Sequence, residues 1–244
     1  DGALTGTMGD IGMFSFGSDK VISCVRGGAL ITSDAEIEKR IRHRVESLPV
    51  QSRMKIFRHL LHYPLFSLGK RRYERGGKWL LAFAKKTFFM TRIMNPREKR
   101  GKWEDEFPTK LPNALAELLL EQLRRLREIT THRMAIARIY RTGLPAAWKH
   151  PTDESLRVHI YLRYTVLVEP KVRDAYMKFC KARGVLLGDW YSTVIAPKDI
   201  YMAAMHYVPG SCPRAEDAAK RSINLPTHGG IGEHDAGVDE IGLA

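Results

Sequence analysis

Lys20 is the residue whose setting in this sequence most favours covalent chemistry. It directly follows Gly17-Ser18-Asp19, a turn sequence, and apolar β-type runs lie on both sides of that turn. An amine at the edge of a core can be partly desolvated, which lowers its pKa and makes it a better nucleophile. Spacing alone favours the alternative, in which Lys20 is a solvated surface lysine like most lysines in turns.

The residues around Lys20 predict the strands that would position it. Met13–Phe16 is a short apolar run rich in aromatic residues, which predicts a buried strand. Val21–Val25 and Ala29–Thr32 are two further β-type runs. Because Arg26-Gly27-Gly28 separates these two runs, we expect them to pair with each other as a hairpin.

The segment Gly9–Asp34 resembles the lysine segment of the DegT/DnrJ/EryC1/StrS family, which consists of pyridoxal-phosphate-dependent sugar aminotransferases of fold type I. The shared pattern is G-D-x-G-x-F-S-F-x-x-x-K-x-I, followed by G-G-A and a strand that ends in threonine. The resemblance extends from about Asp1 to about Asp235. Four later stretches support it: Leu111–Leu123, Leu187–Tyr191, Pro209–Glu216 and Asn224–His228.

This resemblance implies a fold, a cofactor and a reaction. The fold would be α/β, comprising the C-terminal part of the large domain and the small domain of a fold type I transferase. Lys20 would bind pyridoxal phosphate as a Schiff base, and Ser15 would offer its hydroxyl to the cofactor phosphate. We expect transamination of a nucleotide-linked keto-sugar with glutamate as donor, since a branch of the family that dehydrates sugars carries histidine in place of this lysine.

The resemblance also bears on assembly and completeness. It implies a cytoplasmic homodimer that serves cell-surface polysaccharide or glycan biosynthesis. In the family, the residues that clamp the cofactor and pair with its pyridinium nitrogen precede this segment, so we expect the chain to be the C-terminal part of a longer enzyme. The alternative is a catalytically incomplete chain that binds a membrane or a partner through residues 50–102.

We predict four segments along the chain. These are the end of the large domain (1–49), a basic, aromatic helical insertion (50–102), a long connecting helix (103–150) and a small α/β domain (151–244). Helices are expected at Asp34–Leu48, near 53–68 and 76–94, at Lys110–Tyr140 and at Arg173–Arg183, and further strands at Val158–Val168 and Val185–Leu187.

The small domain supplies candidate substrate groups at Asp189, Trp190 and Tyr191. The two aromatic rings could stack on a sugar or a base, and the carboxylate could accept hydrogen bonds from sugar hydroxyls. The alternative is that both rings pack the small domain. We predict no metal site, because the loop histidines lack the spacing of metal ligands.

The net positive charge of the chain comes from Val50–Lys102. This segment holds fifteen Lys and Arg against two acidic residues, a net charge of +13, which equals that of the whole chain. Its apolar and aromatic clusters alternate with basic residues, which admits three interpretations. The favoured one is a surface insertion that packs on its own subunit or a dimer mate.

The second interpretation of this segment is a helix pair lying on an anionic membrane, with Trp79 and Phe88 as anchors. The third is nucleic-acid binding, against which the lack of a recognised nucleic-acid motif argues.

The three cysteines are odd in number and far apart, with no C-x-x-C pair. This spacing argues against a disulfide framework and is typical of a reducing compartment.

Overall fold

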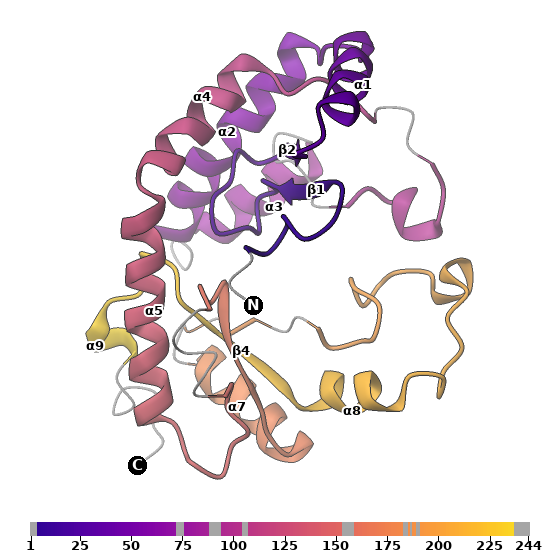
Figure 1. The fold of residues 1–244 in the computed structure, drawn as a ribbon. Helices are drawn as coiled ribbons and strands as arrows, with labels where there is room; N and C mark the ends of the chain where they lie inside the picture. The colour runs from indigo at the N-terminus through magenta and orange to yellow at the C-terminus, as the bar shows by residue number, and fades with distance from the viewer. Residues whose placement is uncertain are drawn as a thin grey trace. The chain divides into compact units, whose positions relative to one another are not determined.

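The computed structural model describes residues 4–71, 76–87, 94–103, 107–152, 159–182, 185, 187–188 and 191–236. The chain forms two compact units (Figure 1), a first unit of Asp1–Asn95 and Trp103–Arg125 and a second unit of Pro96–Lys102 and Leu126–Ala244. The first contains β1 (Gly12–Ser15), β2 (Gly28–Ile31), α1 (Ala35–Ser47), α2 (Arg53–Arg71), α3 (Lys78–Lys86) and α4 (Asn113–Arg124). The second contains η2 (Glu98–Arg100), α5 (Leu126–Gly143), β3 (Arg163–Leu167), α7 (Pro170–Ala182), η3 (Met202–Met205), α8 (Pro213–Arg221), β4 (Ser222–Pro226) and α9 (Glu233–Ala236).

The hairpin of the first unit joins β1 to β2, in a register from Gly12 opposite Ile31 to Ser15 opposite Gly28. The prediction that Val21–Val25 forms a strand paired with the next run is therefore wrong. Val25 has φ of +73°, a left-handed conformation that a valine in a strand does not adopt. The run instead forms the connecting loop.

The prediction that the first strand is buried is also wrong for the described residues. Met13 is 75% exposed and Phe14 is 39% exposed. Among the described parts of the chain, β1 and β2 form a sheet of only these two strands. A two-stranded ribbon without a covering layer leaves its side chains in solvent.

The helix after the hairpin follows its prediction. Asp34 is the N-cap of α1, and its side chain accepts hydrogen bonds from the backbone N–H groups of Glu36 (2.8 Å) and Ile37 (2.9 Å). This cap satisfies two of the N–H groups that a helix start leaves without partners. The sequence therefore fixes where α1 begins.

Two helices occupy the basic segment, as predicted. α2 runs past the predicted end to Arg71, whereas α3 covers only the first part of the predicted 76–94, whose residues 88–93 lie outside the described chain. The two helices approach closely at Gly69, where a Cβ would lie 2.5 Å from Leu81 Cγ. In the described parts of the chain, no helix combines the length and the apolar character needed to cross a membrane.

The long helix predicted at Lys110–Tyr140 is interrupted and forms α4 and α5. Arg125 lies between them, and its N–H donates to the carbonyls of Gln122 and Leu123 in a tightened last turn. The buried residues of α4, Leu115 and Leu119, belong to the first unit. Those of α5 contribute to the core of the second unit, so the two helices serve different cores.

The core of the second unit lies around the antiparallel pair β3 and β4, whose register runs from Arg163 opposite Pro226 to Leu167 opposite Ser222. Helix α7 packs on β4 (Figure 1), and α5 contributes to the same core. The predicted strand at Val185–Leu187 is not found at Val185 or Leu187, its two described residues; the next residue, Gly188, makes a single bridge to Asn224. The predicted strand at Val158–Val168 begins only at Arg163.

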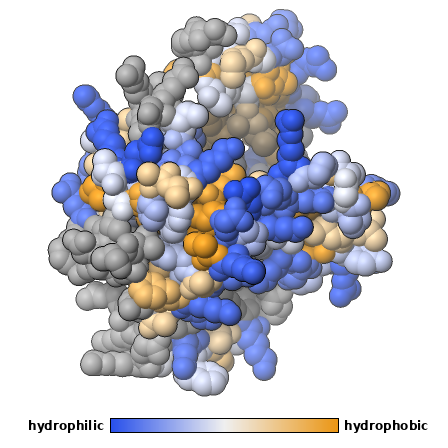
Figure 2. Space-filling model, turned by 90° about the horizontal axis from the view of Figure 1, so that it is seen from below, coloured by the Kyte–Doolittle hydropathy of each residue, from blue (hydrophilic) through white to orange (hydrophobic). Residues whose placement is uncertain are grey.

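Apolar side chains are also common on the surface. Figure 2 shows one face on which apolar residues lie in small groups among hydrophilic ones. Trp79 (72% exposed) and Trp103 (70%) are the two most exposed tryptophans among the described residues. Such scattered exposure is ordinary for single residues, but aromatic side chains grouped on one helix face need an explanation.

A buried arginine is tied into the core of the second unit. Arg133 Nη1 donates to Thr227 Oγ1 (2.9 Å) and to the carbonyl of Leu162 (3.1 Å). Thr227 is fully buried and donates to the carbonyl of Tyr161 at 2.6 Å. Burial lowers the pKa of Arg133, and the neighbouring Arg163 adds to this effect. The network therefore joins α5, the start of β3 and the end of β4.

We expect Thr227→Val to destabilise the protein by about 1–3 kcal/mol, because it leaves buried partners of the hydroxyl without hydrogen bonds. Thr142→Val is the matched control, since the Thr142 hydroxyl is exposed and bonds only within α5. Chemical denaturation of the two variants measures the difference. Equal unfolding midpoints would contradict a structural role for the network.

Candidate functional site

Lys20 lies on the loop between β1 and β2. Its backbone N–H donates to the carbonyl of Gly17 at 3.1 Å, which closes the turn. Its side chain is 39% exposed, and its Nζ lies 3.0 Å from Asp19 Oδ2. Asp19 is its hydrogen-bond partner among the described residues. The loop therefore presents an amine that one carboxylate orients.

Ser15 stands at the end of β1, five residues before this lysine. Its hydroxyl accepts a long hydrogen bond of 3.5 Å from the N–H of Gly17. A Cβ on Gly17 would lie 3.2 Å from Asp19 Oδ1 and 3.7 Å from Ser15 Oγ. A side chain at this position would therefore crowd both the hydroxyl and the carboxylate that orients Lys20.

The loop is anchored through Ser23. The side-chain amide of Gln122, on α4, accepts from the Ser23 N–H (2.9 Å) and donates to the Ser23 carbonyl (2.5 Å). Tyr63, on α2, donates its hydroxyl to Ser23 Oγ at 2.6 Å. Two helices thus hold one loop residue by its backbone and its side chain.

Ser23 also makes hydrogen bonds within the loop. Its hydroxyl donates to the carbonyl of Phe16 (3.2 Å) and accepts from the N–H of Val25 (3.0 Å). The Cys24 N–H donates to the Phe16 carbonyl as well, at 3.1 Å. Lys20 therefore lies on an arc whose two ends are held together by hydrogen bonds.

Cys24 is the other potential nucleophile of the loop, and its surroundings argue against such a role. Its side chain is fully buried, and burial raises the pKa of its thiol. Its Sγ lies 3.1 Å from the carbonyl of Arg26. Because the thiolate is the reactive form, a buried thiol with a raised pKa is inert. Burial likewise raises the pKa of Tyr63, which acts as a hydrogen-bond donor.

The predictions from sequence did not include Ser23, Gln122 or Tyr63. The signal for Gln122 was present, since it is a polar residue in line with Leu115 and Leu119 on the apolar face of its helix. A buried polar side chain on such a face needs a partner. The partner itself could not be identified, because Ser23 is 99 residues away in sequence.

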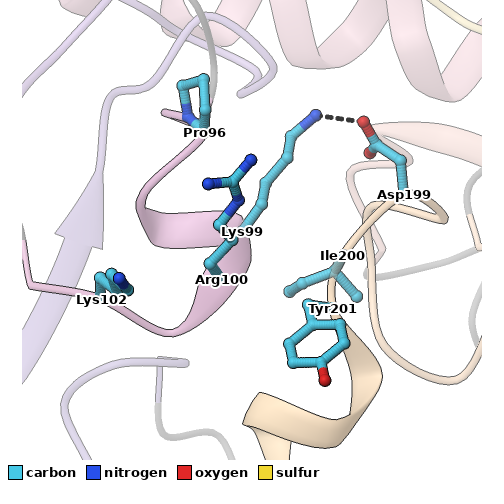
Figure 3. Close-up of a pocket in the computed structure, with 7 residues that line it drawn as sticks. All are labelled: Pro96, Lys99, Arg100, Lys102, Asp199, Ile200 and Tyr201. Carbon is cyan, nitrogen blue, oxygen red and sulfur yellow. Dashed lines mark hydrogen bonds and ion pairs between the residues drawn. The ribbon is translucent and has the colours of Figure 1, made fainter.

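The second unit contains a pocket of about 560 Å³ beside η2 (Figure 3). It is lined by Pro96, Lys99, Arg100, Lys102, Asp199, Ile200 and Tyr201. The Tyr201 N–H donates to the carbonyl of Lys99 at 2.8 Å. Gly101 has φ of +68°, and a Cβ on it would lie 3.1 Å from Ala204 Cβ. The basic turn and the loop before η3 are therefore held in close contact.

The charge of this pocket is positive. Lys99 Nζ lies 2.5 Å from Asp199 Oδ2, and this bond lowers the pKa of Asp199. Arg100 and Lys102 are exposed and have no ion-pair partner among the described residues. Once Lys99 and Asp199 offset each other, two cationic side chains remain. The pocket therefore favours an anionic ligand.

The substrate groups predicted from sequence are only partly described. Asp189 and Trp190 lie outside the described residues, and their roles stay predictions. Tyr191 lines a second pocket of about 310 Å³ in the same unit, which also includes Asp199. In the described parts of the chain, no group of three or more His, Cys, Asp or Glu residues could hold a metal ion.

We expect Gln122→Leu to loosen the Lys20 loop, because it removes both hydrogen bonds to the Ser23 backbone. Loss of two such bonds should increase the equilibrium constant for local opening of the loop by about tenfold or more. Hydrogen exchange of the peptide spanning residues 16–28 measures the change. Gln51→Leu is the matched control, since Gln51 bonds to Thr109 elsewhere in the first unit. Unchanged exchange in Gln122→Leu would contradict the anchoring role.

Solved aminotransferase structures share this fold. TlmJ, an aminotransferase from Streptoalloteichus hindustanus, is 24% identical, with a TM-score of 0.60 over 98% of this chain and 53% of that one. A DegT DnrJ EryC1 StrS aminotransferase from Brucella abortus is 24% identical, with a TM-score of 0.61 over 98% and 51%. DesI, solved in the presence of its TDP-sugar product, is 19% identical, with a TM-score of 0.61 over 99% and 50%. The chain thus spans about half the length of these proteins, and the predicted α/β fold of a partial fold type I enzyme is confirmed.

No curated protein sequence matches the chain. The sequence pattern of the DegT/DnrJ/EryC1/StrS aminotransferase family matches residues 1–66 and 82–240. The match includes the loop of Lys20 and omits residues 67–81, at the junction of α2 and α3. The resemblance inferred from the lysine segment is confirmed, and the chain belongs to the DegT/DnrJ/EryC1/StrS aminotransferase family.

Proposed function

We propose that the protein is a pyridoxal-phosphate-dependent aminotransferase that transfers the amino group of glutamate to a nucleotide-linked keto-sugar. The observation that carries this proposal is the exposed amine of Lys20 on an anchored loop, within a segment that matches the family. The TDP-sugar product in the DesI structure supports the substrate class. We further propose that the enzyme is a cytoplasmic homodimer in cell-surface polysaccharide or glycan biosynthesis.

The residues of the Lys20 loop suit this cofactor. Its aldehyde needs an amine, and Lys20 Nζ is accessible beside Asp19. Its phosphate needs hydroxyl and N–H donors, which Ser15 and Gly17 carry. Lys20 would therefore hold the cofactor covalently and Ser15 would bind its phosphate. When bound, the cofactor supplies an electron sink for the carbon attached to the substrate nitrogen.

The chain contributes proton transfer and orientation. Asp19 holds the Lys20 ammonium at 3.0 Å, so the amine must leave this carboxylate before it can act as a base. Lys20, once deprotonated, would then act as the base that takes the proton from the α-carbon of the amino donor. The Ser23 anchor keeps the loop in place while the flexible side chain of Lys20 moves.

The basic pocket of the second unit supports a phosphate-bearing substrate. We infer that Arg100 and Lys102 bind the diphosphate of the nucleotide-linked sugar, since each lacks an internal ion pair among the described residues. Arginine suits this task because its planar fork can make two parallel hydrogen bonds to phosphate oxygens.

We expect Lys20→Ala to lower the rate of transamination by about a thousandfold or more, because the residue that moves the proton is lost. Lys39→Ala, on the exposed helix α1, is the control and should retain activity. Amino transfer from glutamate to nucleotide-linked keto-sugars is the measurement. Retained activity in Lys20→Ala would remove the assignment and leave the alternative of a binding module built on residues 50–102.

We expect Arg100→Ala to raise KM for the nucleotide-linked sugar about tenfold, as for a lost charge-assisted hydrogen bond. KM for the amino donor should not change, since that substrate carries no diphosphate. Arg138→Ala, an exposed arginine on α5 outside the pocket, is the matched control. An equal change in both KM values, or none, would contradict a diphosphate site.

A further inference from the structure

Helix α3 exposes two aromatic side chains on one face. Trp79 is 72% exposed and Phe83 is 63% exposed, and residues four apart lie on the same side of a helix. The opposite side faces inward, where Ala84 is buried and Leu81 packs against Gly69 of α2. The helix therefore turns Leu81 and Ala84 inward and presents its large aromatic residues to the outside.

Helix α2 carries a similar exposed stripe. Its members share one side of the helix by helical spacing and are 38–57% exposed: Met54, Phe57, Leu60 and Leu68. His59 and His62 lie on the other side and are buried. Both helices of the pair thus leave an apolar face without cover among the described residues.

The charges of the two helices are all of one sign. The sequences of α2 and α3 contain five and three Lys or Arg residues, respectively, and no acidic residue. Lys78 Nζ lies 5.9 Å from the centre of the Trp79 ring, so an ammonium stands beside the exposed aromatic face. An apolar surface rimmed only by cations fits a partner that is both apolar and anionic, as a bilayer with acidic lipids is.

Other partners suit this surface less well. A second copy of the chain would bring the same cationic helices together, and like charges facing each other are unfavourable. Protein interfaces are also depleted in lysine. A nucleic acid would use the cations and the aromatic rings but not the aliphatic stripe of Met54, Leu60 and Leu68.

Part of the helix pair lies outside the match to the family pattern. The family pattern matches residues 1–66 and 82–240 and omits 67–81, which include the end of α2 and Trp79. Trp79 and Leu68 therefore belong to a part of the surface that the family pattern does not describe.

We propose that α2 and α3 lie on the surface of an anionic bilayer, with Trp79 and Phe83 at the level of the head groups and Lys78 and Lys86 beside the lipid phosphates. Tryptophan prefers this interface because its ring is apolar and its N–H is polar. The contact would hold the enzyme at the membrane, and it does not depend on the reaction that the enzyme catalyses.

Sedimentation of the full-length protein with lipid vesicles tests this proposal. We expect binding to phosphatidylcholine vesicles that contain phosphatidylglycerol, little binding to phosphatidylcholine alone, and a decrease with salt. Trp79→Ser combined with Phe83→Ser should weaken partitioning by about tenfold or more. Trp103→Ser is the matched control, since Trp103 is equally exposed and lies outside both helices, and it should bind like the wild type.

A pair of charge reversals tests the cationic part. Lys78→Glu with Lys86→Glu should weaken binding by about tenfold or more, because each lysine near an anionic surface contributes about fivefold. Lys171→Glu with Lys178→Glu, on α7 of the second unit, changes the net charge equally and should have little effect. Unchanged circular dichroism and thermal unfolding would show that every variant is folded.

Three results would overturn the proposal. The first is a lack of sedimentation with acidic vesicles at low salt, or sedimentation that the aromatic substitutions leave unchanged. The second is a change of oligomeric state in Trp79→Ser with Phe83→Ser without vesicles, which would assign the surface to a second copy. The third is binding of polyuridylate that is tighter than vesicle binding and lost only in the charge reversals.

Discussion

The amide of Gln122 on the backbone of Ser23 is the interaction on which the candidate site depends. It joins the loop of Lys20 to α4 through two hydrogen bonds, while Tyr63 of α2 holds the hydroxyl of the same serine. A loop of irregular backbone would otherwise have several local conformations. The anchor fixes the position of the loop but leaves the Lys20 side chain exposed and able to move, which a residue that must both bind and transfer a proton requires.

In both units, side chains that hydrogen-bond to backbone groups hold a segment in place, but the segments differ. In the first unit, the half-buried amide of Gln122 holds a loop. In the second, Arg133 and Thr227 satisfy backbone carbonyls at the start of β3, beneath a core of tyrosines and aliphatic side chains. In both cases removal of one partner would leave a desolvated polar atom, so these contacts specify structure more strongly than their number suggests.

Local signals predicted much of the fold, and long-range contacts decided the rest. The N-cap at Asp34 and the pair of basic helices were evident from the sequence. The partner of β1 was not, because Val21–Val25 and Ala29–Thr32 both have strand-like compositions, and composition does not reveal the left-handed conformation of Val25. The break at Arg125 was hidden because apolar spacing continues across it, although each side serves a separate core. Lys20 could be identified by its motif, but its anchor at Gln122 could not.

The most direct test of the account is chemical labelling of Lys20 in the full-length protein. The protein would be incubated with pyridoxal phosphate, reduced with borohydride and digested for peptide mapping. The account predicts one pyridoxyl group on the peptide that contains Lys20, and a much lower yield at the other lysines. Label spread over surface lysines, with no preference for Lys20, would contradict the claim that this loop is the cofactor site.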